Sequence, residues 1–230
     1  MLRLHGADRS SGRGPIRCKN EPVPSRLHRA RVYGEKWAHF NSNSLPWRRL
    51  AIHREMMARE AFVRWPLEGN VLEAFRNGRI DLGPHVHFEP HVWIDVLGGR
   101  LRIGEYSKLT LGVMIVVDEY VEIGKHCGIG ACSFIADADH RFDDPNRPWL
   151  WQGLRRRGPT IIGDNVWCGI NVVIPGGVTI GEHCVVAANS VVTRDLPAHT
   201  VCAGAPARPV KEIEYAEEPL PELDLGGRWR

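Results

Sequence analysis

Apolar residues recur at every sixth position in one part of the chain. The series consists of Ile162, Cys168, Ile174, Ile180, Val186 and Val192. An amphipathic helix repeats its apolar face about every 3.6 residues and a half-buried strand about every two, so neither explains a period of six. Short fixed periods are typical of solenoids, in which successive coils stack on one another. The pattern therefore predicts a β-solenoid.

A less regular form of the same pattern begins near Ile80. Aliphatic residues start its hexads at Leu97, Ile103, Leu111, Val117, Ile123, Ile129 and Ile135, with a two-residue slip after Ile103. We expect each hexad to form a short strand and a corner, and three hexads to close a coil of about eighteen residues. The aliphatic residue points to the coil axis, and small residues four places further on fill the interior. Those in the regular part are Val166, Val172, Val178, Cys184 and Ser190.

One long interruption breaks this register. Ile135 and Ile162 are 27 residues apart, which is not a multiple of six. The segment between them is polar, aromatic and interrupted by prolines, so we predict a loop at 139–159 that leaves the solenoid. Inserts in solenoids lie on the surface, often on the binding face, and long loops are more often functional than short ones.

The two ends of the chain differ from the repeat. Residues 1–36 hold nine Lys and Arg against three Asp and Glu, and 1–43 is predicted to be a basic, disordered leader. It lacks the regular aromatic residues of a nucleic-acid-binding arm, so no nucleic-acid partner is expected. The β-helix is predicted over 80–200, and 201–230 forms a C-terminal cap and an acidic tail.

Between the leader and the repeat, 44–79 is predicted to be a helical preface. Ser44 and Pro46 are typical of a helix start, and Pro66 stops the helix. Its predicted apolar face is formed by Trp47, Leu50, Met57 and Ala61. No apolar run reaches the length of a signal peptide or a membrane span, so the expected location is the cytoplasm.

The six cysteines carry no metal or disulfide pattern. None forms a CxxC pair, and Cys127 and Cys184 each lie four places after a hexad start, where small residues belong. We interpret the cysteines as small core residues of a reduced protein, and no metal site is expected.

Several segments together resemble the hexapeptide-repeat acyltransferases, and in particular the sugar and polysaccharide O-acetyltransferases such as the galactoside and maltose enzymes. The resemblance rests on 162–169, 172–181, 190–197 and 203–208 and covers about 80–213. It implies an all-β fold: a left-handed parallel β-helix of hexapeptide repeats with a short N-terminal helical segment and an extruded loop. It also implies a homotrimer with active sites shared between subunits.

The resemblance also implies a catalytic histidine. His140 occupies the place of the family's general base at the start of the extruded loop, where it would take the proton of an acceptor hydroxyl. Position alone would favour a solvated loop histidine, and position together with the flanking motifs favours catalysis. Asp118 matches a position that helps to orient the acceptor, although it also suits a polar substitute for the hexad glycine. The family's asparagine eight residues before it is Thr110 here, which departs from the galactoside and maltose enzymes.

For the donor, the resemblance implies acetyl-CoA in a groove between neighbouring solenoids. The matching residues are Trp167, Gly169, Ala188, Thr193, Arg194, Arg208 and Lys211. The two last cations would face the nucleotide phosphates. Taken singly, corner packing or ordinary surface charge explains these residues as well. Trp149 and Trp151 either wall the acceptor site or attach the loop to a neighbouring coil.

The function expected from these residues is transfer of an acetyl group from acetyl-CoA to a hydroxyl of a sugar or glycan precursor, by direct attack. One alternative is an amino-sugar nitrogen as the acceptor. A γ-type carbonic anhydrase would need a histidine pair five residues apart, but Ala131 follows His126 at that distance. The remaining alternative is a non-catalytic solenoid, which the long loop and the donor-groove residues disfavour.

Overall fold

The computed structural model describes Ser25, Leu27, Arg31 and residues 45–216. The predicted leader therefore lies almost wholly outside the described residues, as does the acidic tail from residue 217 onward. The contacts divide the chain into residues 1–37 and 38–230, and the fold belongs to the second of these units.

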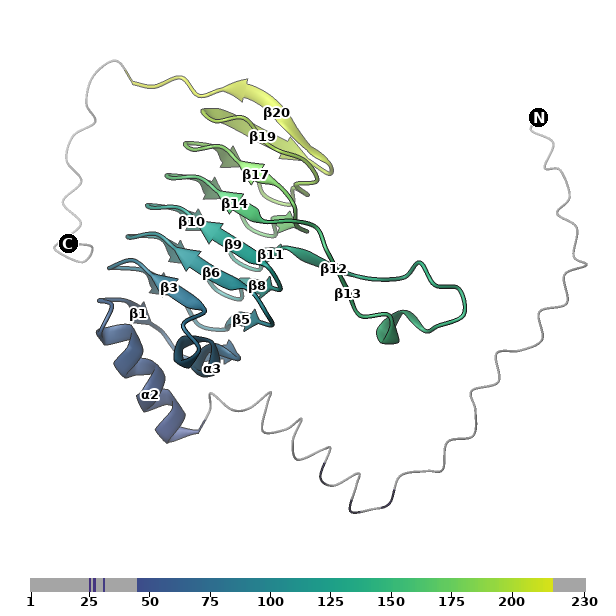
Figure 1. The fold of residues 1–230 in the computed structure, drawn as a ribbon. Helices are drawn as coiled ribbons and strands as arrows, with labels where there is room; N and C mark the ends of the chain where they lie inside the picture. Colours follow the sequence, from purple (N-terminus) through teal and green to yellow (C-terminus); the bar gives the residue numbers. More distant parts are fainter. Residues whose placement is uncertain (1–24, 26, 28–30, 32–44, 217–230) are drawn as a thin grey trace, which may run out of the picture. The chain divides into compact units, whose positions relative to one another are not determined.

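Three parallel sheets form the sides of a stacked β-helix (Figure 1). The first sheet contains β1 (Phe62–Val63), β4 (His87–Phe88), β7 (Lys108–Leu109), β10 (Gly128–Ile129), β15 (Trp167–Cys168), β18 (Val185–Val186), β19 (Thr200–Gly204) and β20 (Ala207–Glu212). The second contains β2 (Leu67–Gly69), β5 (Val92–Val96), β8 (Met114–Val117), β11 (Phe134–Ala136) and β16 (Val173–Ile174). The third contains β3 (Ile80–Leu82), β6 (Arg100–Ile103), β9 (Tyr120–Ile123), β14 (Thr160–Ile162) and β17 (Thr179–Ile180). Each of the first five coils gives one strand to each sheet, which confirms the predicted parallel β-helix; its left hand stays a prediction.

The core lies on the axis of the stack. All six members of the regular series, from Ile162 to Val192, are at most 1% exposed. The small residues four places after the hexad starts are buried as well, which confirms the predicted interior. Burying one such aliphatic side chain contributes roughly 1.5–3 kcal/mol, and stacking makes the buried column continuous from coil to coil.

The upstream coils are longer than predicted. The first sheet advances by 21 residues from His87 to Lys108 and by 20 from Lys108 to Gly128, against 18 from Trp167 to Val185. The predicted inward positions Leu97 and Leu111 are wrong, because these side chains are 46% and 50% exposed. The buried residues are Val96 and Leu109. The two-residue slip that was predicted after Ile103 lies instead inside the four-residue strand β8. Ile115 and Val117 of this strand both point inward.

The β-helix also begins earlier than residue 80. β1 and β2 already pair with β4 and β5, and α3 (Val71–Arg76) is inserted between β2 and β3. The preceding helix α2 is Pro46–Met57, and its buried residues are Ile52 and Met56. The predicted face of Trp47, Leu50 and Met57 is wrong, since these side chains are more than half exposed. The helix instead packs its Ile52 and Met56 side against the first coil.

The opposite end of the stack is closed by an antiparallel pair. β20 turns back along β19 and gives this end a charged edge strand. From the side of the fourth coil, β12 (Ala138–His140) and β13 (Leu154–Arg156) leave as an antiparallel hairpin (Figure 1). The 3-10 helix η2 (Trp149–Trp151) lies in the loop that joins them.

Candidate active site

The hairpin β12–β13 presents His140 on a defined face. The strands pair Ala138 with Arg156, Asp139 with Arg155 and His140 with Leu154. Directly opposed residues of an antiparallel pair share a face, and successive residues alternate between faces. His140, Leu154 and Arg156 therefore lie on one face of the hairpin, and Asp139 and Arg155 lie on the other.

His140 is exposed and contacts an aromatic ring. The centroid of its imidazole lies 5.1 Å from that of Trp149, with the rings at 80° in an edge-to-face arrangement. Such a contact restrains the ring while leaving its nitrogens open to solvent. The structure thus brings together His140 and Trp149, which were predicted separately as base and acceptor wall.

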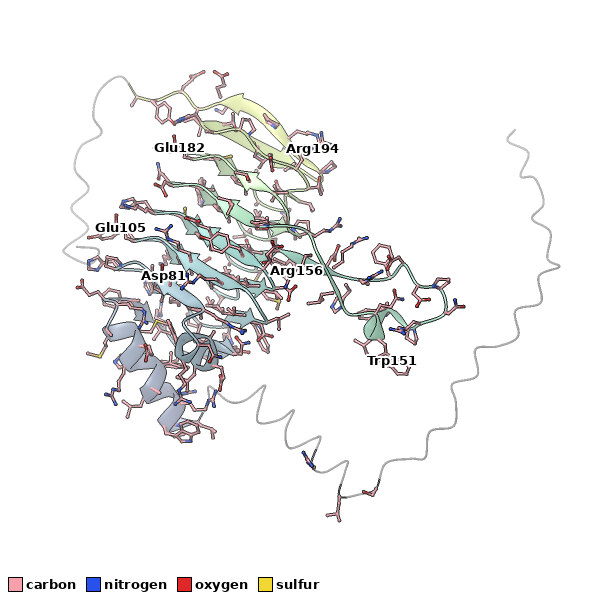
Figure 2. The ribbon with its side chains drawn as sticks, viewed as in Figure 1. Asp81, Glu105, Trp151, Arg156, Glu182 and Arg194 are labelled. Carbon is pink, nitrogen blue, oxygen red and sulfur yellow. The ribbon has the colours of Figure 1, made fainter. Side chains whose placement is uncertain are left out.

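Trp151 lies further out on the hairpin and is 69% exposed. Figure 2 shows it on the extruded loop, away from Arg156 at the base. Trp149 itself is 56% exposed. Both expectations for these two side chains, a wall of the acceptor site and attachment to a neighbouring coil, stay predictions.

Asp118 lies at the base of the hairpin rather than beside its tip. Its carboxylate accepts a hydrogen bond from Nε of Arg156 at 2.9 Å. On the other face of the hairpin, Arg157 donates to Asp139 at 3.0 Å. Asp118 thus contacts the hairpin through Arg156, which lies on the same hairpin face as His140.

Two residues at this base, Asp137 and Arg156, were not predicted. Asp137 is fully buried, and its carboxylate accepts hydrogen bonds from the backbone N–H groups of Asp118, Glu119 and Tyr120 at 2.8, 2.7 and 2.6 Å. The inward parity set by Ile135 could have indicated a buried carboxylate at 137. Arg156 could not have been found in this way, because only the strand register places it.

The predicted donor residues form two groups on separate corners of the coils. Trp167 lies on the outer face of the first sheet and is 61% exposed. Gly169 and Ala188 follow at the next corner, where a Cβ on Gly169 would lie 2.7 Å from the backbone nitrogen of Ala188. A side chain at Gly169 would therefore collide with the next coil.

The second group comprises Thr193 and Arg194, which follow Val192. Val191 bridges to β16 and Leu196 to β17, so both residues lie at the corner between the second and third sheets. This is the corner from which the hairpin leaves, and Figure 2 shows Arg156 and Arg194 on the same side of the stack. Arg208 and Lys211 extend the first group along β20, opposite Ala203 and Val201.

The outer face of the second sheet lies between these two corners and carries a column of apolar side chains, with the carboxylates of Glu68 and Asp95 on the first two coils. Its strand register aligns the outward residues Trp93, Met114, Phe134, Val173 and Val191. The corresponding residues of the third sheet include Asp81, Arg102 and Glu122, which form ion pairs. The predicted base and donor residues thus frame one apolar side of the solenoid.

Comparisons with known proteins agree with this architecture. The family model described as bacterial transferase hexapeptide (six repeats) matches residues 159–194. A hexapeptide-repeat acetyltransferase from Vibrio cholerae, solved in complex with acetyl coenzyme A, is 33% identical over 63% of this chain and 77% of its own, with a TM-score of 0.54. A maltose O-acetyltransferase from Clostridium difficile is 32% identical over 63% of this chain and 75% of its own, with a TM-score of 0.54. The chain belongs to the hexapeptide-repeat acetyltransferases.

Among curated relatives of this family, the galactoside O-acetyltransferase of Escherichia coli is 34% identical over 57% of this chain and 63% of its own length. A probable acetyltransferase of Mycobacterium tuberculosis is 34% identical over 61% of this chain and 46% of its own. The chain thus spans about half to two thirds of the curated relatives that it matches. The family model itself covers the segment with Trp167, Gly169, Ala188, Thr193 and Arg194.

The cysteines of this acetyltransferase-family chain behave mainly as core residues. Cys127, Cys168, Cys184 and Cys202 are buried free thiols, as predicted, whereas Cys132 is exposed at a corner. Burial raises the pKa of the Cys127 thiol to about 11 and also raises the pKa of Cys168. These two thiols stay protonated near neutral pH, so neither supplies a nucleophilic thiolate.

Within the described part of the chain, no group of three or more His, Cys, Asp and Glu side chains is arranged to hold a metal ion. The described helices include none of the length and apolarity that crossing a membrane requires.

Proposed function

We propose that this protein transfers an acetyl group from acetyl-CoA to a hydroxyl of a sugar or glycan precursor, with His140 as the general base. The observation that carries the proposal is the exposed imidazole of His140, restrained by Trp149 on a hairpin that leaves the solenoid beside an apolar sheet. The relatives support the acceptor class, since their names include galactoside and maltose O-acetyltransferases.

The proposed reaction is a direct transfer. The imidazole of His140 removes the proton from the acceptor hydroxyl, and the oxygen attacks the thioester carbonyl. The new C–O bond replaces the C–S bond, and the departing thiolate of coenzyme A takes the proton back from the imidazolium. Imidazole suits this exchange because it titrates near neutral pH. The protonated thiols of Cys127 and Cys168 are in accord with a route that forms no acyl-enzyme.

We assign the donor to the apolar side of the solenoid between the two corners. Gly169 is half-buried and Ala188 is exposed at the corner that forms one border, and we assign this corner to the pantetheine arm. Trp167 offers an exposed aromatic face, and Arg208 and Lys211 of β20 supply cations for the nucleotide phosphates. Thr193 and Arg194 are proposed donor contacts on the other border.

A homotrimer is part of this proposal. The aligned apolar side chains of the second sheet form a face that a second copy of the chain would cover, closing a groove over the donor residues. Contiguous exposed apolar surface is typical of protein interfaces. Location in the cytoplasm stays a prediction.

The function is tested by release of the coenzyme A thiol from acetyl-CoA. Purified protein is offered a panel of sugars, nucleotide sugars and amino sugars, and His140→Gln is compared with the exposed helix variant His53→Gln. We expect at least one hydroxyl acceptor, a rate about 10²–10⁴-fold lower for His140→Gln, and no change for His53→Gln.

Transfer by His140→Gln at the wild-type rate would contradict the role of His140 as the base. Transfer to amines alone would replace the hydroxyl acceptor with an amino sugar. Absence of acetyl-CoA binding in equilibrium dialysis would remove the donor assignment.

A further inference from the structure

The hairpin contributes no buried side chain of its own. Between residues 138 and 159, every residue is intermediate or exposed. A segment without buried apolar contacts opens easily unless polar contacts hold it. Its orientation relative to the solenoid must therefore depend on the contacts at its base.

Asp137 is the innermost of these contacts. It is the last fully buried residue before the chain leaves the fourth coil, and three backbone N–H groups of the third coil satisfy its carboxylate. Burying a carboxylate is unfavourable unless such bonds are made. The carbonyl of Asp137 also accepts a hydrogen bond from the backbone nitrogen of Arg157 at 2.9 Å. Asp137 thus joins the third coil to both strands of the hairpin.

Asp118 and Arg156 form the outer contact. The backbone of Asp118 is held by Asp137, and its carboxylate binds Arg156 on the hairpin face that carries His140. The same hydrogen bond raises the pKa of Arg156, so its guanidinium stays charged. His140 pairs directly with Leu154, and Arg156 lies two residues after Leu154 on the same strand. Arg156 and His140 are therefore diagonal neighbours across the two strands.

The fifth coil closes the base from the other side. Gly177 has φ of 66°, and a Cβ at this position would collide with the carbonyl oxygen of Arg157. A Cβ at Gly176 would lie 3.0 Å from the backbone of Asp137. The hairpin base is therefore enclosed by the corners of two coils.

We propose that Asp137, Asp118 and Arg156 form a clamp that sets the direction in which the hairpin leaves the β-helix, and with it the position of His140. The clamp makes Asp118 a positioning residue that acts through Arg156. This inference rests on the proposed role of His140. Small displacements of a reacting group reduce rates steeply, by about 10²-fold for 1 Å.

The test compares the single variants Asp118→Asn and Arg156→Gln with the reciprocal exchange Asp118→Arg, Arg156→Asp. We expect each single variant to lower kcat by about 10- to 100-fold with little change in KM for acetyl-CoA. Amide hydrogen exchange, followed by mass spectrometry, should rise across 138–157. The reciprocal exchange restores the ion pair with opposite polarity, and we expect it to recover about tenfold in kcat and to slow the hairpin exchange.

A matched control is the ion pair of Arg102 and Glu122 on the third sheet. Its side chains are 55% and 27% exposed, against 63% and 20% for Arg156 and Asp118. The same substitutions there should leave both kcat and hairpin exchange unchanged. Asp137→Asn places an NH2 group against at least one of the three N–H donors and should loosen the hairpin further. If this variant does not fold, the variants of Asp118 and Arg156 decide.

The clamp is overturned if Asp118→Asn abolishes transfer while Arg156→Gln retains the full rate with unchanged hairpin exchange. Failure of the reciprocal exchange to recover either kcat or protection would also overturn it. If His140→Gln is fully active, the proposed role of His140 as the base fails, and the hydrogen-exchange comparison still decides whether the clamp holds the hairpin.

Discussion

The β-helix and its hairpin are stabilised in opposite ways. In the coils, a buried aliphatic residue recurs with each hexad and aligns with its counterparts above and below. The hairpin has no buried residue between 138 and 159 and is held at its base by Asp137 and by ion pairs. The comparison shows how a rigid stack can carry a segment whose position is set by a few polar contacts.

The insertion leaves the stack continuous because it occupies a corner. The first sheet advances by 39 residues from Gly128 to Trp167, yet β10 and β15 pair directly, as do β11 and β16. The chain leaves after the second sheet and returns to the third without displacing a core residue. Loop length adds little to the free energy of closure, so a corner tolerates a long insert.

The largest contrast in stability should appear when matched apolar residues of the two regions are truncated. Ile123 is fully buried in the third coil, whereas Leu150 in η2 is 64% exposed. Ile123→Ala should lower the free energy of unfolding by about 2–5 kcal/mol, because it leaves a cavity between coils. Leu150→Ala should change it by less than about 0.5 kcal/mol. Urea denaturation followed by circular dichroism measures both, and equal losses would show that the hairpin is part of the core.

The second contrast concerns activity within the hairpin. Trp149 contacts the His140 ring and Trp151 is not recorded in contact with it. An edge-to-face contact contributes about 0.5–1.5 kcal/mol, so Trp149→Leu should lower kcat by roughly 2- to 12-fold. Trp151→Leu should act mainly on KM for the acceptor. Steady-state kinetics with the acceptor found by the screen separates the two, and equal effects on kcat would remove the bracing role of Trp149.

The smallest effect is a difference in thiol reactivity between surface and core. N-ethylmaleimide at neutral pH should modify Cys132 and spare Cys127, Cys168 and Cys184 in the folded protein. Cys132 is exposed, whereas burial raises the pKa of Cys127 to about 11 and of Cys184 to about 12. Peptide mass spectrometry with and without denaturant provides the measurement. Rapid labelling of Cys168 without denaturant would mean that the coils open more readily than their packing implies.

The predictions of inward residues that were wrong failed because of local geometry. Leu97 and Leu111 fit the six-residue count but lie at corners, because strands such as β8 accommodate two extra residues without disturbing the stack. The helical preface was predicted from capping and apolar residues, yet β1 and β2 within it already belong to the first coil. A three-residue strand such as β2 has too few positions to show a period.

The stacked coils, the buried series from Ile162 to Val192 and the place of the inserted loop could all be predicted from the residue pattern. Burial on a common axis imposes a period that is visible residue by residue. The contact of His140 with Trp149, and that of Asp118 with Arg156, 38 residues away, became visible in the folded chain. These contacts depend on strand register and on corners from different coils, which no local pattern encodes. The apolar side of the solenoid likewise forms only when the coils stack. Its borders are the corners with Gly169 and Ala188 and with Thr193 and Arg194.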